Sequence, residues 1–87
     1  MPYEVRYTDR FKTAYLKLTK QERELFARKL RLFVQDPYDP SLRTKIIQGT
    51  ELFEWGVNMD IWVILYHEGD RLVALLDIGR HSKFKKY

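Results

Sequence analysis

The residues best suited to chemistry lie near the C-terminus of this 87-residue chain, in the run DIGRHSKF at positions 77–84. His81 directly follows what the apolar pattern predicts to be the last strand, and basic side chains surround it. A histidine titrates near neutral pH, so it can give or accept a proton in a reaction. From composition alone, an ordinary exposed histidine in a basic tail is about as good an interpretation as a catalytic one.

The same segment carries the net charge of the protein. The chain has 16 Lys+Arg and 12 Asp+Glu, a formal charge of +4, and residues 80–87 hold four basic residues and no acid. This distribution excludes a uniformly basic nucleic-acid coat and predicts a local contact with an anion. Phe84 and Tyr87 alternate with the tail lysines, which suits base stacking combined with phosphate contact. Docking of the tail onto a sheet is the alternative.

Other candidate binding residues lie earlier in the chain. Arg43 and Lys45 stand in a loop or short strand and could reach a phosphate across a sheet, although a solvated loop is the favoured alternative. Trp55 and Trp62 lie on predicted strands and could stack on a base. Packing inside the protein is the competing interpretation, and it is stronger for Trp55.

The titratable residues outside this segment give weaker signals. Asp60 and Glu54 are the acids expected nearest the sheet face, and both are equally ordinary turn and strand residues. His67 ends a strand and is interpreted as structural. It and His81 are the only histidines, and the chain has no cysteine. With no phosphate-binding glycine loop or dinucleotide fingerprint either, the sequence predicts no metal site and no cofactor.

Local patterns predict a strand followed by two helices. Alternation of apolar and polar residues predicts a strand over 3–7. Apolar residues at i, i+4 and i+7 from Phe11 predict a helix with Thr8 as its N-cap. The capping box at residues 19–22 starts a second helix, which Asp36-Pro37 ends. With almost no loop between them, the two helices form a helical hairpin.

The C-terminal half reads as a series of strands. Strands are predicted over 52–57, 61–66 and 72–78, with a short strand at 44–47 left open. The short turns between them force antiparallel neighbours. The predicted fold is α+β: an N-terminal strand, a helical hairpin and a three- to four-stranded antiparallel meander, with the helices on one sheet face. A single domain spans residues 1–87.

Charge divides along this order. Residues 10–31 hold eight basic and two acidic residues, whereas residues 46–79 hold one basic and six acidic. A solvated face explains any single lysine, but the whole imbalance suits a long polyanion such as ribosomal RNA, or an acidic protein partner. No apolar run approaches the length of a membrane span, and the first residues do not read as a signal peptide. The sequence therefore predicts a cytoplasmic protein.

Taken in order, these segments resemble the RelE/ParE superfamily of toxins from bacterial type II toxin–antitoxin modules. The closing Gly-x-His element resembles the RelE-like ribonuclease branch in particular. The resemblance covers nearly the whole chain and rests on the opening strand 3–7, on Phe11, Leu18 and Leu25, and on the segments 36–37, 40–42, 45–49, 52–54 and 75–81.

The resemblance implies an activity. RelE-like toxins enter the ribosomal A site and cut messenger RNA, with the substrate 2′-hydroxyl as nucleophile. It implies a catalytic set of His81, Arg80, Lys45 and Asp60, with the histidine as general acid or base. It implies an RNA-binding set of Arg43, Trp62, Lys83, Phe84, Lys85, Lys86 and Tyr87.

One position departs from the family pattern. Trp62 stands where many relatives carry an arginine, and an indole cannot neutralise a phosphate. Either Arg80 takes over that role or activity is weakened or lost. Two further interpretations stay open: a ParE-like toxin that inhibits DNA gyrase without being a nuclease, and an inactive remnant that only binds an antitoxin.

The resemblance also implies partners. The expected ones are the ribosome with its messenger RNA, and an acidic antitoxin that covers the helical hairpin and blocks or displaces the basic tail. A toxin–antitoxin hetero-oligomer would bind operator DNA through the antitoxin.

Overall fold

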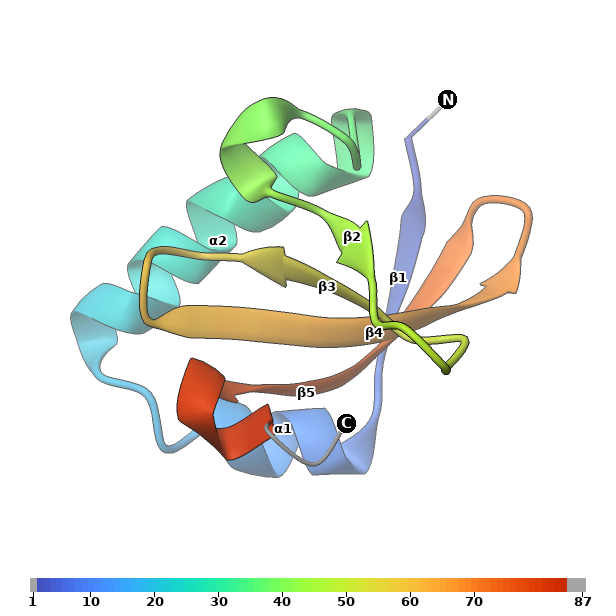
Figure 1. Ribbon diagram of the computed structural model, residues 1–87. Helices are drawn as coiled ribbons and strands as arrows, with labels where there is room; N and C mark the ends of the chain where they lie inside the picture. Colours follow the sequence, from blue (N-terminus) through green and yellow to red (C-terminus); the bar gives the residue numbers. More distant parts are fainter. Residues whose placement is uncertain (1, 85–87) are drawn as a thin grey trace.

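The computed structural model describes residues 2–84, and its element order confirms the predicted α+β fold (Figure 1). The elements are β1 (Glu4–Tyr7), α1 (Asp9–Tyr15), α2 (Lys20–Gln35), the 3-10 turn η1 (Pro40–Leu42), β2 (Lys45–Ile46), β3 (Phe53–Gly56), β4 (Ile61–Gly69), β5 (Leu72–Arg80) and the 3-10 turn η2 (His81–Phe84). The short strand left open at 44–47 exists as β2. Within residues 2–84, no helix has the length and apolar character needed to cross a bilayer.

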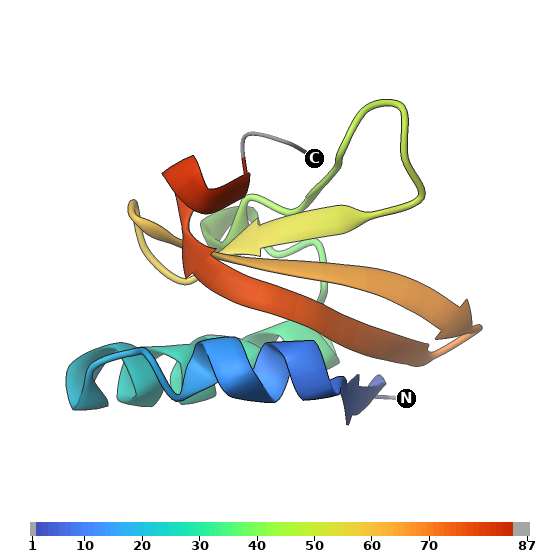
Figure 2. The same cartoon turned by 90° about the horizontal axis from the view of Figure 1, so that it is seen from below.

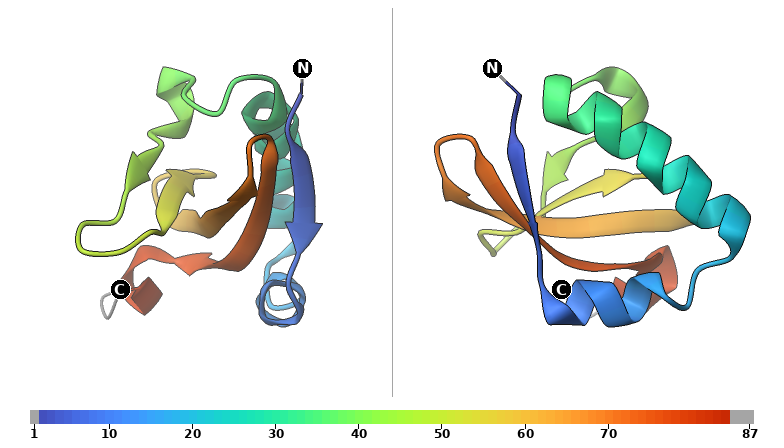
Figure 3. Two further views of the ribbon diagram at one scale, coloured as in Figure 1. Left: turned by 90° about the vertical axis from the view of Figure 1, so that its right-hand side faces the viewer. Right: turned by 180° about the vertical axis from the view of Figure 1, so that it is seen from behind.

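The five strands form one sheet in the order β1-β5-β4-β3-β2. Strands β2 to β5 pair antiparallel, as the short turns predicted. Strand β1 instead lies parallel to β5, along its first half, from the Glu4–Leu72 pair to the Tyr7–Leu75 pair (Figure 3). The chain between these two strands is long enough for the crossover that a parallel pair requires, because it passes through both helices and then through β2, β3 and β4.

Side-chain caps begin both helices, as predicted. The Thr8 hydroxyl accepts from the Phe11 amide at 3.1 Å and donates to the Leu75 carbonyl at 2.8 Å, so the cap also fastens α1 to β5. At the start of α2, Thr19 and Glu22 form the reciprocal capping box, with bonds of 2.8 and 3.1 Å. These contacts fix where each helix starts relative to the sheet.

Both helices lie on one face of the sheet, and η2 lies on the other (Figure 2). The main core fills the space under the helices, where Trp55 stacks between Phe26 and Phe33 at centroid distances of 6.0 and 5.3 Å. Trp55 is fully buried there, so it packs the core and has no free face for a base.

We call the sheet face opposite the helices the open face. Paired residues on neighbouring strands share a face, so the register places two rows of side chains here. One row is Lys45, Glu54, Ile64 and Asp77, and the other is Gly56, Trp62 and Gly79. Phe84 from η2 packs on both rows, in a small apolar cluster with Trp62 and Ile64.

Candidate functional site

His81 stands at the surface of the open face, where β5 ends and η2 begins. Its backbone N–H donates to the Asp60 carbonyl at 2.9 Å, so the turn between β3 and β4 fixes the position of the histidine. Its ring centre lies 5.3 Å from that of Trp62, at an interplanar angle of 36°. An exposed imidazole held at both backbone and ring can exchange protons with a bound molecule.

Trp62 forms the floor of this region and is only 8 % exposed. Its neighbours across the strands are Gly56 and Gly79, which add no side chain beside the indole. Its Nε1 is buried and has no hydrogen-bond partner among the described residues. A base could stack on Trp62 only if the groups that cover the indole moved.

Arg43 is one of those groups. Its guanidinium carbon lies 4.5 Å above the centre of the Trp62 ring, within the range of a cation–π contact. Its Nη2 donates to the Asn58 carbonyl at 2.6 Å. A Cβ at position 56 would overlap the guanidinium, so Gly56 makes room for it.

The backbone of Arg43 is also unusual. It has a φ of 56°, in the left-handed region that non-glycine residues rarely adopt. Such a conformation costs on the order of 1–3 kcal/mol and persists only where the surroundings hold it. The contacts with Trp62 and Asn58 supply that support.

Lys45 lies beside Glu54 across the β2–β3 pair, with 3.6 Å between its Nζ and the carboxylate. The lysine is largely exposed, whereas the glutamate side chain is almost wholly buried. Lys45, one of the cations predicted to contact phosphate, is therefore already paired with a buried carboxylate.

Arg80 bridges two acids at the end of β5. Its guanidinium lies 3.5 Å from Glu22 at the start of α2 and 4.0 Å from Asp60 in the β3–β4 turn. The structure thus brings together three of the four predicted catalytic residues, Arg80, His81 and Asp60. Sequence reasoning gave Glu22 only a capping role and missed its second contact with Arg80.

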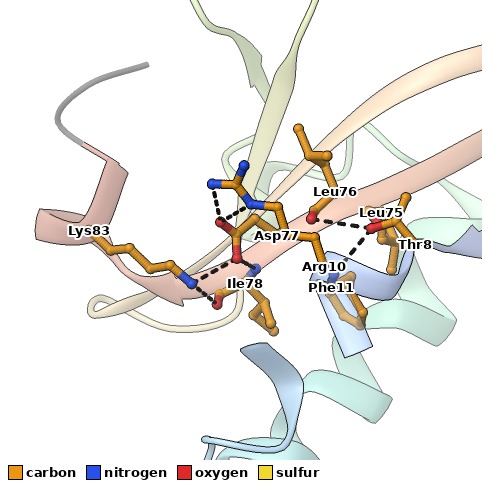
Figure 4. A network of polar contacts seen from close by, with 8 residues as sticks. All are labelled: Thr8, Arg10, Phe11, Leu75, Leu76, Asp77, Ile78 and Lys83. Carbon is orange, nitrogen blue, oxygen red and sulfur yellow. Dashed lines mark hydrogen bonds and ion pairs between the residues drawn. The ribbon is translucent and has the colours of Figure 1, made fainter. Parts of the chain in front are cut away.

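Lys83 turns toward Asp77, a residue to which the sequence patterns gave no role (Figure 4). Its Nζ lies 2.8 Å from the Asp77 carboxylate, and Arg10 from α1 approaches the other oxygen at 3.2 Å. Asp77 is fully buried and also accepts the Ile78 amide at 2.8 Å. A lone acid inside an otherwise apolar strand run was the available signal, because buried carboxylates need partners.

The other predicted residues divide into two groups. Phe84 is buried against Trp62 and Ile64, so its ring docks the end of the described chain on the open face. Lys85, Lys86 and Tyr87 lie outside the described residues. His67 lies near the end of β4 and packs edge-on against Phe53 at 4.9 Å, whereas His81 follows β5, so the structure does not bring the two histidines together.

No metal-binding arrangement accompanies the site: the described part of the chain holds no cluster of three or more His, Asp or Glu side chains able to bind an ion. The chemical groups on the open face and beside it are one imidazole, several cations and the carboxylates near them.

Comparison with solved structures identifies the fold class. No protein-family model and no curated protein sequence matches the chain. Among solved structures, YafQ from E. coli strain BL21(DE3) is similar with a TM-score of 0.77 and 13 % identity, covering 95 % of this chain and 98 % of YafQ. The archaeal RelE in complex with RelB from Pyrococcus horikoshii gives 0.75 and 18 %, covering 95 % and 99 %.

A YoeB/ParE toxin from Agrobacterium tumefaciens is equally similar, with a TM-score of 0.75 and 10 % identity over 90 % of this chain and 98 % of that one. The chain therefore has the fold of the RelE, YafQ and YoeB/ParE toxins. The predicted resemblance to this superfamily is confirmed at the level of the fold.

Proposed function

We propose that this protein is the toxin of a toxin–antitoxin module and a ribosome-dependent endoribonuclease. The observation that carries the proposal is the position of His81. It is an exposed imidazole at the end of β5, beside Trp62 and Arg80, on the open face of a RelE-type fold.

Cleavage of RNA through its own 2′-hydroxyl needs few groups. A base takes the 2′-hydroxyl proton, the oxygen attacks phosphorus, and the 5′-oxygen leaves with a proton from an acid, which yields a 2′,3′-cyclic phosphate. Cations stabilise the extra negative charge on the phosphate at the transition state. We assign proton transfer to His81, and charge stabilisation to the arginines and lysines around it.

The basic helices fit a contact with ribosomal RNA or with an acidic protein. Between α1 and α2 lies an apolar groove of about 570 Å³, and Lys12 and Arg31 are among its lining residues. Leu16, also in the lining, is 74 % exposed. We propose that an apolar and acidic segment of an antitoxin occupies this groove, because the negative charge of such a segment complements the basic helical hairpin.

Controlled expression tests the nuclease. The chain is expressed from a tightly regulated promoter, growth is followed, and messenger-RNA ends are mapped on translating ribosomes. We expect growth arrest with cuts at the A site, both abolished by His81→Ala. His67→Ala is the matched control, because it also removes a histidine, but this histidine lies near the end of β4 and not at the junction of β5 with η2.

The other outcomes separate the alternatives. Growth arrest with uncut messages and double-strand DNA breaks would replace the nuclease by a gyrase inhibitor. Absence of any growth effect from a folded, expressed protein would favour an inactive antitoxin-binding remnant. Cleavage that survives His81→Ala would move the proton-transfer role to another residue.

A further inference from the structure

The four described cations predicted to contact phosphate differ in whether a carboxylate is already paired with them. Lys45 is paired with Glu54, and Lys83 with Asp77. Arg80 has two acids within 4.0 Å. Arg43 differs from all three, because its guanidinium makes no ion pair within residues 2–84.

The neighbours of Arg43 leave its positive charge uncompensated. Its hydrogen-bond partners are the Asn58 carbonyl and, at 3.5 Å, the Met59 sulfur. The Trp62 ring below it is attracted to a cation through its π electrons, but it carries no net charge. Arg43 is partly buried and has no carboxylate paired with it, so it is a better partner for an incoming anion than a cation that is already in an ion pair.

Several features hold this guanidinium in one place. The left-handed backbone at Arg43 turns the side chain over the sheet, Gly56 leaves space for it, and Trp62 supports its flat face. Since His81 lies against the same indole, one ring positions both a cation and a proton-transfer group. Placement of reacting groups before the substrate binds is what makes such a site effective.

We infer that Arg43, stacked on Trp62, is the residue that contacts the scissile phosphate, and that Trp62 is the positioning residue that holds it there. The inference rests on the proposed function in taking RNA as the substrate. It gives the tryptophan on β4 a function: the cation comes from the loop after η1, and the strand supplies the ring beneath it. Arg80 is then not needed to replace the arginine that many relatives carry at the position of Trp62.

Binding of RNA tests the inference without requiring cleavage. The purified full chain is titrated with a fluorescent single-stranded RNA oligomer whose 2′-O-methyl groups prevent cutting, at several salt concentrations. Each phosphate contact on a single strand contributes about 0.7 to the slope of log K against log salt. We expect Arg43→Ala to weaken binding and to reduce the slope by about that amount.

Arg71→Ala is the matched control. Arg71 also lies over an aromatic ring, 5.6 Å from the centre of Tyr3, and its loss removes the same charge. It lies in the turn between β4 and β5, away from His81, so we expect the slope to stay at the wild-type value. An equal loss in both variants would show a general charge effect and overturn the inference.

Variants of Trp62 test the positioning role. Trp62→Phe keeps a ring under Arg43 and should retain most of the binding, whereas Trp62→Leu should weaken it toward the level of Arg43→Ala. The double variant Arg43→Ala/Trp62→Leu should bind no worse than Arg43→Ala alone, because both act through the same guanidinium. Additive losses would contradict the positioning role. If Trp62→Leu fails to fold, the comparison of Arg43→Ala with Arg71→Ala still decides the phosphate contact.

The inference and the proposed function can fail separately. If the wild type cleaves messenger RNA and Arg43→Ala keeps the same activity and RNA binding, the role of Arg43 is overturned and the nuclease proposal stands. If Arg43→Ala specifically loses RNA binding but the wild type does not cleave messenger RNA on ribosomes, the phosphate-contact role stands and the nuclease proposal is overturned. A wild-type chain that does not bind the oligomer even at low salt would overturn the inference.

Discussion

Lys83 and Asp77, which lie on either side of the junction between β5 and η2, are joined by an ion pair of 2.8 Å. Arg10 approaches the same carboxylate from α1, so one buried acid connects α1, β5 and η2 (Figure 4). Because η2 begins with His81, this contact helps to set where the imidazole stands.

Loss of the Asp77 carboxylate should therefore loosen η2. We expect Asp77→Asn to lower the free energy of unfolding by about 1–3 kcal/mol, because charge-assisted hydrogen bonds inside the protein are lost. Amide exchange over residues 81–84 should accelerate, which hydrogen-exchange NMR measures. Lys83→Met should cost less, because Arg10 still pairs with the acid. Unchanged stability and exchange in Asp77→Asn would show that the ion pair does not hold η2.

Gly56→Ala should displace Arg43 without harming the fold. The new Cβ would overlap the guanidinium, which is the far end of a long side chain and can be pushed away from Trp62. We expect the midpoint of urea unfolding to change little, while the Arg43 side-chain NMR signals lose the ring-current shift caused by Trp62. RNA affinity should fall as in Arg43→Ala. Retained ring-current shifts in Gly56→Ala would show that the strand makes room in another way.

The pair formed by Arg6 and Glu68 predicts a pH dependence. Hydrogen bonds from the Arg6 guanidinium, at 2.7 and 2.8 Å, hold the pKa of the Glu68 carboxyl below its ordinary value. A depressed pKa in the folded state means that Glu68 stabilises the fold above its unfolded pKa. This contribution is lost as the pH falls through the folded-state pKa.

NMR titration of the Glu68 carboxyl checks this dependence. Arg6→Ala should raise its midpoint toward the ordinary glutamate value, and the stability difference between wild type and variant should shrink in acid. The effect should be small and sensitive to salt, because both groups are exposed. An identical midpoint in both proteins would remove the assigned cause.

The groove between α1 and α2 gives a prediction about the antitoxin. Leu16→Asp should weaken antitoxin binding about tenfold or more, because it places a charge in the apolar groove and opposite an acidic partner. The fold should be unaffected, since Leu16 is largely exposed. Calorimetry with the proposed antitoxin, which we expect to be encoded in the neighbouring reading frame, measures the affinity. Tyr38→Asp, at an exposed aromatic outside the groove, is the control, and equal effects of the two variants would place the antitoxin elsewhere.

The sequence by itself determined the elements of this protein. Thr8 and the Thr19–Glu22 capping box begin the two helices, and Pro37 ends the second, because these signals act through hydrogen bonds and sterics within a few residues. The strands followed equally from their apolar runs and short turns. The sequence also indicated His81 as a candidate, because a histidine that directly follows the last predicted strand is recognised from its neighbours in the chain alone.

The tertiary structure alone decided what surrounds that histidine. Arg43 and Trp62 meet because β3 and β4 pair in one register and because the left-handed backbone of Arg43 turns its own side chain back over the sheet. The pairing of β1 with β5, and of Asp77 with Arg10, likewise joins residues far apart in the chain. Such contacts depend on strand register and on the packing of one element against another. Local sequence patterns carry little of that information, since an alternating pattern determines which face a side chain takes but stays the same after a slip of two residues.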